Sequence, residues 1–444
     1  MKHKKLLSMS LAVCMIGSCI LTGCGSTDTG SGSTAQESTQ SQTQDASQTT
    51  EDVSSEKVVI NYYAWSEGDY LQEIVDAYNA QSTIAEVKMT QVNSSDYDDK
   101  LITMLSGSND IDVFNMRSGS LLANLASTGN LADITEYIAD SGLDVSVYGT
   151  GFAETQVDDK FYALPYRSSA YALFYNKAIF DEMGVEYPDN LTWDEYADLA
   201  LSLTSGEGTD RFYGSYIPDW NTCIYSVTQE GSNLTDDDLT PLGTWLSRLN
   251  RFYNEDNSHM SYTDMKSSGT DAINFFCNGG SAMYPGGEWT ISDILTMLEN
   301  NPQLNETFEL GIAVLPQVEE TDDPVTIGGV STFIGINATS EKKEAAYDFI
   351  QFVAGKEAAM LVAQAGAIPA YIDDEVTAAF EEAIGVEGAE NILGPKKLQE
   401  TLFTSSYSEL VTIYQEEMEL YLIGEQSLED TLSNFEERRA EIQQ

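Results

Sequence analysis

The chain has 444 residues, with 72 Asp and Glu against 21 Lys and Arg, so its formal net charge at pH 7 is -51. Nucleic-acid binding needs a basic face, and this charge balance argues against that class. Beyond the N-terminal segment the only histidine is His259. Zinc sites and Ser-His-Asp triads depend on histidine, so we expect no metal, no cofactor and no catalytic residue. We expect His259, in the polar stretch NEDNSHMSYTD, to lie at the surface.

The first 23 residues have the pattern of a secretory signal. A lysine-rich start precedes a mostly apolar run over 6–21, which is short for a membrane span. The run ends in Leu-Thr-Gly before Cys24. This ending resembles a bacterial lipobox, which implies cleavage before Cys24 and lipidation of that cysteine. An ordinary signal peptide and an uncleaved anchor are the alternatives. We therefore expect a lipid-anchored protein on the extracellular face of the cell membrane.

A change of composition follows Cys24. Residues 25–56 contain no aromatic residue, no Lys and no Arg. Such a segment buries too little apolar surface to offset its ordering entropy, so we expect a disordered Ser/Thr/Gln spacer over 24–56. The rest of the chain is long enough for two lobes. Its cysteines are Cys223 and Cys277, and a disulfide and two core thiols both remain open.

Predicted strands and helices alternate along the first part of the folded chain. A β-branched and aromatic stretch predicts a strand over 58–65, and apolar residues at helical spacing predict a helix over 71–78. The same alternation predicts a strand at 87–92, a helix at 97–105, the end of a buried strand at 112–115 and a helix beginning at 121–125. This order favours a mainly parallel sheet with helices on both faces.

Further elements follow in the second part. Separate strands are predicted at 160–167, 172–177 and 332–337. Thr192 and Glu195 form a capping box that opens a helix. Ser340 is expected to cap another helix. Amphipathic helices over 406–423 and 428–442 end the chain.

Five blocks of this sequence, in order, resemble the family 1 extracellular solute-binding proteins, the maltose-binding-like receptors of ABC importers. The blocks are 112–115 with 129–133, 162–177 with 192–195, 282–289, 328–336 with 340–346, and 366–370. The resemblance implies a periplasmic-binding-protein-like (type II) α/β fold, with two α/β lobes joined by three hinge crossings near 165–170, 326–332 and 366–370. The N-lobe is expected over 57–166 and 332–367, and the C-lobe over 170–327 and 369–444.

The family resemblance also implies a function. It is that of a monomeric receptor that captures a sugar or oligosaccharide between its lobes and delivers it to an ABC permease, without being an enzyme. A polyamine, polyol or peptide ligand is an alternative. An extracellular glycoside hydrolase is a second alternative and needs two carboxylates beside one bond. A surface adhesion or signalling protein is a third.

Sugar sites combine aromatic rings, which stack on C–H faces, with polar groups that bond hydroxyls. Trp289 follows two glycines and matches the family's stacking aromatic in the C-lobe, with core packing as the alternative. Trp65 ends the first predicted strand, where ligands of open α/β sheets gather. With Glu67 it matches the family's N-lobe loop that meets the ligand.

The remaining candidates are less specific. Asn115 and Arg117 follow a strand end, and bracing of the loop is their alternative role. Tyr166, Arg167 and Ser169 lie on the first expected crossing, and Arg167 has a structural ion pair as its alternative.

Three further candidates complete the predicted site. Trp220 is a loop aromatic for which binding and packing are both open. Gly329, with Gly328, is expected to let backbone approach closely at the second crossing. Tyr407 is the last candidate. Because the individual cleft residues differ from those of the malto-oligosaccharide receptors, the identity of the sugar stays open.

Overall fold

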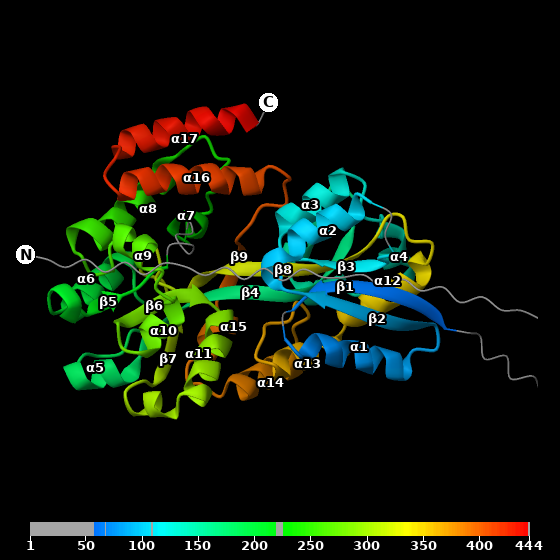
Figure 1. The fold of residues 1–444 in the computed structure, drawn as a ribbon, viewed down its shortest axis with the longest axis horizontal. Helices are drawn as coiled ribbons and strands as arrows, with labels where there is room; N and C mark the ends of the chain where they lie inside the picture. Colours follow the sequence, from blue (N-terminus) through cyan, green and yellow to red (C-terminus); the bar gives the residue numbers. More distant parts are fainter. Residues whose placement is uncertain (1–56, 67, 108–109, 219–224, 443–444) are drawn as a thin grey trace, which may run out of the picture. The chain divides into compact units, whose positions relative to one another are not determined.

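The computed structural model describes residues 57–66, 68–107, 110–218 and 225–442 (Figure 1). The predicted signal, the lipidated Cys24 and the spacer lie outside these residues, and so do Glu67 and Trp220. Glu56–Gln444 forms one compact unit. Within the described ranges, every helix is too short or too polar to cross a membrane.

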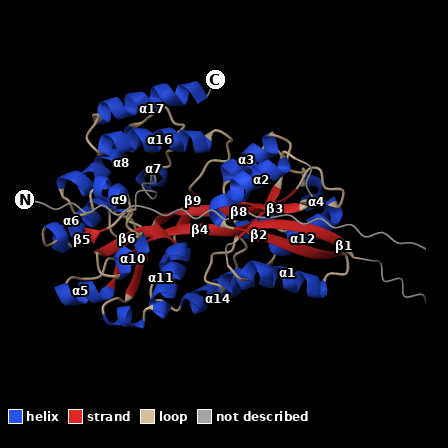
Figure 2. Cartoon of the chain, in the orientation of Figure 1, coloured by secondary structure: helices blue, strands red, loops and turns tan. Residues whose placement is uncertain are grey.

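A single sheet runs through this unit in the order β2-β1-β3-β8-β4-β6-β5, with β7 beside β4 and β9 beside β8 (Figure 2). The strands are β1 (Val58–Trp65), β2 (Ala85–Val92), β3 (Val113–Met116), β4 (Ala163–Asn176), β5 (Tyr213–Ser215), β6 (Ser281–Gly287), β7 (Leu310–Val314), β8 (Val325–Ile336) and β9 (Lys396–Gln399).

The expectation of a mainly parallel sheet is wrong, because the sheet is mixed. β1 is parallel to β2 and β3, as the alternating order predicts. β8 is antiparallel to β3 and β4, and β4 is antiparallel to β6 and β7. The two strands predicted at 160–167 and 172–177 are one long strand, β4. The chain leaves the first half of the sheet along β4 and returns along β8, and this reversal makes the central pairing antiparallel.

Helices cover the sheet. In the first half, α2 and α3 lie on one side and α1 and α13 on the other (Figure 1). The helices before β6 are α1 (Tyr70–Gln81), α2 (Tyr97–Leu105), α3 (Gly119–Ser127), α4 (Thr135–Ser141), α5 (Lys177–Met183), α6 (Trp193–Leu203), α7 (Tyr225–Gln229), α8 (Thr240–Asn250), α9 (Tyr262–Ser268) and α10 (Ala272–Cys277). Those after it are α11 (Trp289–Asn300), α12 (Lys343–Val353), α13 (Lys356–Gln364), α14 (Asp374–Ile384), α15 (Glu390–Leu393), α16 (Tyr407–Leu422) and α17 (Leu428–Ile442).

The capping signals in the sequence predict the start of one helix correctly and that of another wrongly. At α6 both bonds of the capping box form between Thr192 and Glu195. At α12 the predicted cap is wrong, because the N-cap residue is Lys342 and makes no side-chain cap. The Ser340 hydroxyl instead accepts the Lys342 amide and donates to Asp112, which ties the loop to β3.

Buried apolar residues form two separate clusters. The first draws mainly on residues 60–166 and 330–362, and the second mainly on residues 170–327 and 363–435. We call them the N-cluster and the C-cluster. The chain passes between them at 166–170, at 327–330 and at 362–370.

These three passages lie side by side. β4 and β8 pair from Ala163 to Ala170. The third passage joins them, because the Ser168 amide donates to the Ile368 carbonyl at 2.9 Å and the Ala370 amide donates to the Tyr166 carbonyl at 3.0 Å. A three-segment connection of this kind is where one part of a protein can rotate against another.

His259 contradicts its predicted surface position. Its side chain is buried, with the ring 4.9 Å from Phe252 and Nε2 2.8 Å from the Tyr196 hydroxyl. Nδ1 lies 3.0 Å from the Ser258 hydroxyl. Ser258 is buried with it, whereas Asn254, Glu255 and Asn257 of the same stretch are exposed. The burial of the imidazole lowers its pKa to about 3. Cys277 is a buried free thiol, and Cys223 lies outside the described residues.

Candidate ligand-binding site

A cavity of about 540 Å³ lies beside the first passage. Its walls come from both clusters: residues 68–70 and 73 at the start of α1, Arg167 on β4, residues 288, 289, 292 and 293 at the start of α11, and residues 361 and 364–367 at the end of α13. The volume falls within the range of roughly 300–1,000 Å³ that is usual for small-molecule pockets.

Arg167 connects the two sides of this cavity. Its Nη1 donates to the Tyr70 hydroxyl at 3.3 Å, and Tyr70 belongs to the N-cluster. Its Nη2 donates to Oε1 of Glu288 at 3.1 Å, at the junction of β6 and α11. The guanidinium on the first passage therefore links the start of α1 to the start of α11.

Glu288 is an almost fully buried carboxylate, 1% exposed. Its amide donates to the Ala170 carbonyl at 2.9 Å, and its Oε2 accepts the Ala170 amide at 3.4 Å. Burial raises the pKa of Glu288 to about 7, although the Arg167 charge and the amide hydrogen bonds act in the opposite direction. The carboxyl group thus changes its charge near neutral pH.

Charged groups of the C-terminal segment lie close to this carboxylate. Burial raises the pKa of Glu400, whose Oε1 accepts the Tyr171 hydroxyl at 2.8 Å. Burial lowers the pKa of Lys397, and the negative charge of Glu288 opposes that change. Partly desolvated charges of this kind are typical of functional sites, although structural ion pairs produce them too.

Trp289 lines the cavity as the first residue of α11. Its ring meets Tyr171 edge to face, with the ring centroids 5.4 Å apart. A Cβ at Gly287 would lie only 2.2 Å from the indole, so a glycine is needed for the ring to fold back over the strand. Gly287 thus makes room for the Trp289 ring in the cavity wall.

Trp65 and Arg117 lie together in the N-cluster half. Trp65 packs edge to face on Tyr97 at 5.1 Å, and the Arg117 guanidinium lies 6.0 Å from the Trp65 ring. Arg117 also donates from Nε to both carboxylate oxygens of Asp98, at 2.9 and 3.1 Å, and from Nη2 to the Ser94 carbonyl at 3.0 Å. These contacts are those of a loop brace, and a binding role for Arg117 stays a prediction.

Asn115 and Tyr166 are deeper than a cleft residue is expected to be. Asn115 is 0% exposed and accepts the Tyr62 hydroxyl at 2.8 Å. Its Nδ2 donates to the Tyr166 hydroxyl at 2.8 Å. This hydrogen-bonded chain lies within the N-cluster, and neither residue lines the cavity. Their predicted contact with a ligand stays a prediction.

Ser169, Gly329 and Tyr407 complete the predicted set. Ser169 pairs with Gly329 across β4 and β8, and its buried hydroxyl has no hydrogen-bond partner among the described residues. Gly329 has a φ of +91°, and a Cβ there would lie 2.4 Å from Oε1 of Gln399, so close approach at this crossing does need glycine. The Tyr407 hydroxyl donates to the Glu400 carbonyl at 3.3 Å.

The sequence reasoning missed several residues that line the cavity. Asp69, Tyr70, Glu288 and Asp293 were not predicted. Glu288 directly precedes Trp289 in the same block and was within reach of the motif argument. Tyr70 and Asp293 have no signal in the sequence, because their place in the wall depends on the approach of α1 to α11.

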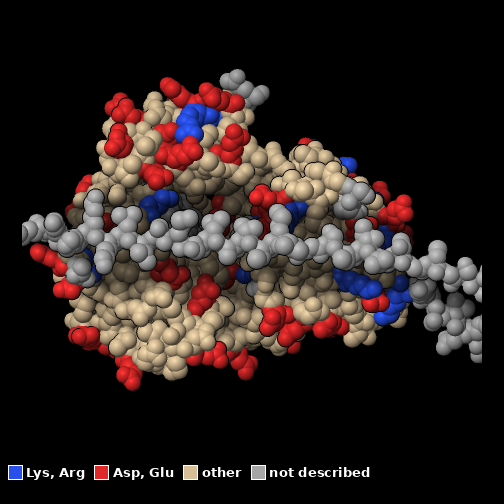
Figure 3. All heavy atoms as spheres, viewed as in Figure 1, with Lys and Arg blue, Asp and Glu red and all other residues tan. Residues whose placement is uncertain are grey.

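The described residues hold no group of three His, Cys, Asp or Glu side chains that is suited to a metal ion. On the face shown in Figure 3, acidic side chains are spread over both ends and basic ones are few. This agrees with the net charge of the sequence and with a solvated acidic surface.

Comparisons with known proteins give the same fold. A "sugar transporter" from Rhizobium etli, solved in an open conformation, is 27% identical with a TM-score of 0.77 and covers 86% of this chain and 98% of its own. An ABC substrate-binding protein from Listeria monocytogenes in complex with cycloalternan is 25% identical with a TM-score of 0.73 and the same coverage. These structures confirm the predicted type II binding-protein fold.

Sequence comparisons agree. The "Multiple sugar-binding protein" of Streptococcus mutans is 24% identical over 338 residues, which are 69% of this chain and 73% of that protein. The family model described as "Bacterial extracellular solute-binding protein" matches residues 64–360, more than half of the chain. The predicted family is confirmed: this chain belongs to the bacterial extracellular solute-binding proteins.

Proposed function

We propose that this protein is the receptor of an ABC importer, which captures a sugar or oligosaccharide between its lobes and delivers it to the membrane permease. The observation that carries the proposal is the cavity beside the passages, whose walls come from both clusters and contain Trp289, Arg167 and Glu288. The sugar-related names of the similar proteins with 24–27% identity support the choice of ligand.

The lining groups suit a polyhydroxylated ligand. The Trp289 ring offers an apolar surface for C–H groups, and Asp69, Asp293 and the Tyr70 hydroxyl offer hydrogen bonds to hydroxyls. Arg167 already touches both lobes in this structure. A ligand that bonds to the same groups would stabilise the closed arrangement, because it adds contacts that exist only when the lobes approach.

The proposal includes the lobe limits predicted from the sequence, with 57–166 and 332–367 in one lobe and 170–327 and 369–444 in the other. The two clusters of buried residues support these limits. Such a receptor breaks no bond itself, and ATP hydrolysis belongs to another subunit.

We also propose a lipid anchor on Cys24, with residues 24–56 as the spacer between the membrane and a monomeric folded unit on the extracellular face. The support is the lipobox-like ending of the signal and the boundary of the compact unit at Glu56.

A polyamine is the second candidate ligand. Four carboxylates line the cavity, from Asp69, Glu73, Glu288 and Asp293, and the only cationic side chain in the wall among the described residues is Arg167. Together with an aromatic ring, this lining is also compatible with an ammonium ligand.

The test is a thermal-shift panel on the purified full-length protein with mono- and oligosaccharides, polyols, polyamines and peptides. A ligand that binds only the native state raises the melting temperature according to its saturation. A shift with one sugar class supports the proposal and names the cargo. A shift with polyamines alone would mean that the ligand is a polyamine and not a sugar. Release of a product from an oligosaccharide would mean that the protein is an enzyme and not a receptor.

A further inference from the structure

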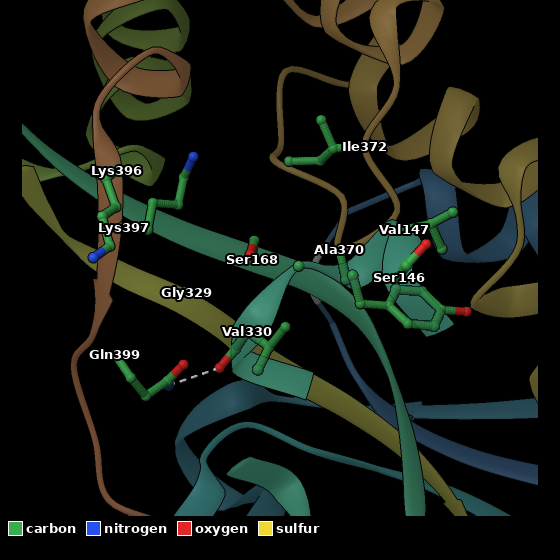
Figure 4. Close-up of a pocket in the computed structure, with 12 residues that line it drawn as sticks. Ser146, Val147, Ser168, Gly329, Val330, Ala370, Ile372, Lys396, Lys397 and Gln399 are labelled. Atoms are coloured by element: carbon green, nitrogen blue, oxygen red, sulfur yellow. Dashed lines mark hydrogen bonds between the residues drawn. The ribbon is translucent and has the colours of Figure 1, made fainter. Parts of the chain in front are cut away.

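A second cavity, of about 380 Å³, shares no lining residue with the first. Arg167 lines the first cavity, whereas Ser168, the next residue on β4, lines the second. The other walls are residues 146–149 from the N-terminal half, 329 and 330 on β8, 370 and 372 after the third passage, and 396, 397 and 399 on β9. In Figure 4, β9 stands on one side of this cavity and Ser146, Val147, Ala370 and Ile372 on the other.

The charges around this cavity are unusual for the chain. Its charged lining residues are Lys396 and Lys397, and none of its described lining residues is acidic. The whole sequence carries 72 acidic residues against 21 basic ones. In the part of the chain that the structure describes, no carboxylate lies within ion-pair distance of either lysine ammonium. Lys396 and Lys397 thus form a local positive site, at a cavity without an acidic lining residue, in an acidic protein.

Lys397 is the more sequestered of the two. It is only partly exposed, whereas Lys396 is exposed. Its ammonium donates to the Leu393 carbonyl at 3.4 Å, and among the described residues this long contact leaves most of its hydrogen-bonding capacity unused. Burial of an ammonium is unfavourable. The Glu288 charge offsets part of that cost for Lys397 without forming an ion pair, and an anion in the cavity would offset more of it.

Gln399 and Ser168 add neutral polar groups. Nε2 of Gln399 donates to the Val330 carbonyl at 3.0 Å, whereas its buried Oε1 has no hydrogen-bond partner among the described residues. The dashed line in Figure 4 marks the Gln399 contact. Ser168 contributes a hydroxyl from β4. An oxyanion that also carries an O–H group suits this lining, since it can accept from the lysines and donate to Gln399.

We propose that this second cavity binds a small oxyanion of the hydrogenphosphate type, held by Lys396 and Lys397. Its walls come from segments on both sides of the passages, so a bound anion contacts both halves of the molecule. Binding of the anion is then coupled to the arrangement of the lobes. By linkage it is also coupled to the affinity of the first cavity for its sugar. Only this coupling rests on the proposed sugar-binding function, because the anion site itself is independent of it.

The experiment is a calorimetric titration of the purified full-length protein with inorganic phosphate, without sugar and at constant ionic strength set with NaCl. Saturable binding is expected, and K396Q/K397Q should weaken it by at least about tenfold, because hydrogen bonds to charged groups are among the stronger ones. The matched control, K57Q/K88Q, removes two lysines that do not line this cavity and should bind like the wild type.

Three results would overturn the proposal: no saturable binding by the wild type, unchanged binding by K396Q/K397Q, or equal weakening in the control. If K396Q/K397Q fails to fold, K396Q alone changes only an exposed side chain and should still weaken binding. A titration with acetate in place of phosphate tests whether the site prefers a carboxylate or a phosphate. We expect acetate to bind less tightly, because ionised acetate has no hydrogen-bond donor for Gln399. A sugar response without a phosphate response would leave the receptor function intact and remove only the anion site.

Discussion

The Arg167 guanidinium and the Glu288 carboxylate form an ion pair of 3.1 Å, in which the side chains are 17% and 1% exposed. One partner lies on the first passage and the other begins the turn into α11. A pair this buried is costly to desolvate, and removal of one partner leaves the other charged without compensation. This ion pair therefore affects both the stability of the protein and its response to pH.

The first prediction concerns Glu288→Gln and pH. Since the pKa of Glu288 is about 7 in the folded protein and 4.5 without perturbation, the folded state binds more protons between these values. Its contribution to the free energy of unfolding therefore falls as pH rises from about 4.5 to about 7, by a few kcal/mol. Urea unfolding across this range should show that Glu288→Gln removes this slope relative to the wild type. Glu86→Gln, on the exposed side of β2, is the control, and equal slopes in all three proteins would refute the assignment.

The second prediction concerns His259, whose effect has the opposite sign. Burial lowers its pKa to about 3 from 6.5, so the unfolded state binds more protons in between. The stability that this residue contributes is present above about pH 6.5 and is lost as the pH falls toward 3. His259→Gln should lose less stability between pH 7 and pH 4 than the wild type. It should be less stable at pH 7 by about 1–3 kcal/mol, because Tyr196 and Ser258 both lose their hydrogen bond to the imidazole. An unchanged acid slope would contradict this.

The third prediction tests the aromatic wall of the first cavity. Trp289→Ala should weaken binding of the ligand found in the thermal-shift panel by about 2–4 kcal/mol, because an aromatic anchor is lost from an enclosed site. Calorimetric titration measures the loss. Tyr187→Ala, which removes a 43% exposed ring away from the cavity, should bind normally. Normal binding by Trp289→Ala would mean that the ring only packs against Tyr171.

The fourth prediction compares two glycines with positive φ. At Gly328 φ is +152° and a Cβ would lie 2.1 Å from the Ser169 carbonyl oxygen, whereas at Gly366 φ is +76° and the space is open. Gly366→Ala should cost about 1 kcal/mol from backbone strain alone. Gly328→Ala should cost clearly more, since β4 and β8 must separate there. Unfolding in urea ranks the two variants, and a larger loss at Gly366 would contradict the role of Gly328 in the close pairing.

The fifth prediction concerns the proposed anchor. Cys24→Ser should release the protein from the membrane into the medium with unchanged ligand affinity, because the lipid is attached only through this thiol. Fractionation of cells followed by immunoblotting measures the release. Ser26→Ala is the control and should remain with the membrane. Retention of Cys24→Ser at the membrane would exclude the lipobox interpretation.

The sequence by itself determined several of the local elements, and it determined the family. The limits of α2 and α17 and the capping box of α6 follow from residues within a few positions of one another, and local spacing records such contacts well. The ordered blocks identified the type II fold, and Trp289 was singled out because it closely follows two glycines.

The tertiary structure decided what depends on distant residues. The Arg167 contacts to Tyr70 and Glu288 join positions 97 and 121 residues apart, and no periodicity encodes such a pairing. The antiparallel pairing of β4 with β8 and the partner of Arg117 were hidden for the same reason. So was the burial of His259, because a polar stretch of sequence does not reveal which of its side chains turn inward. Folding brings these groups together from distant parts of the chain. The chemical character of both cavities therefore depends on the tertiary structure.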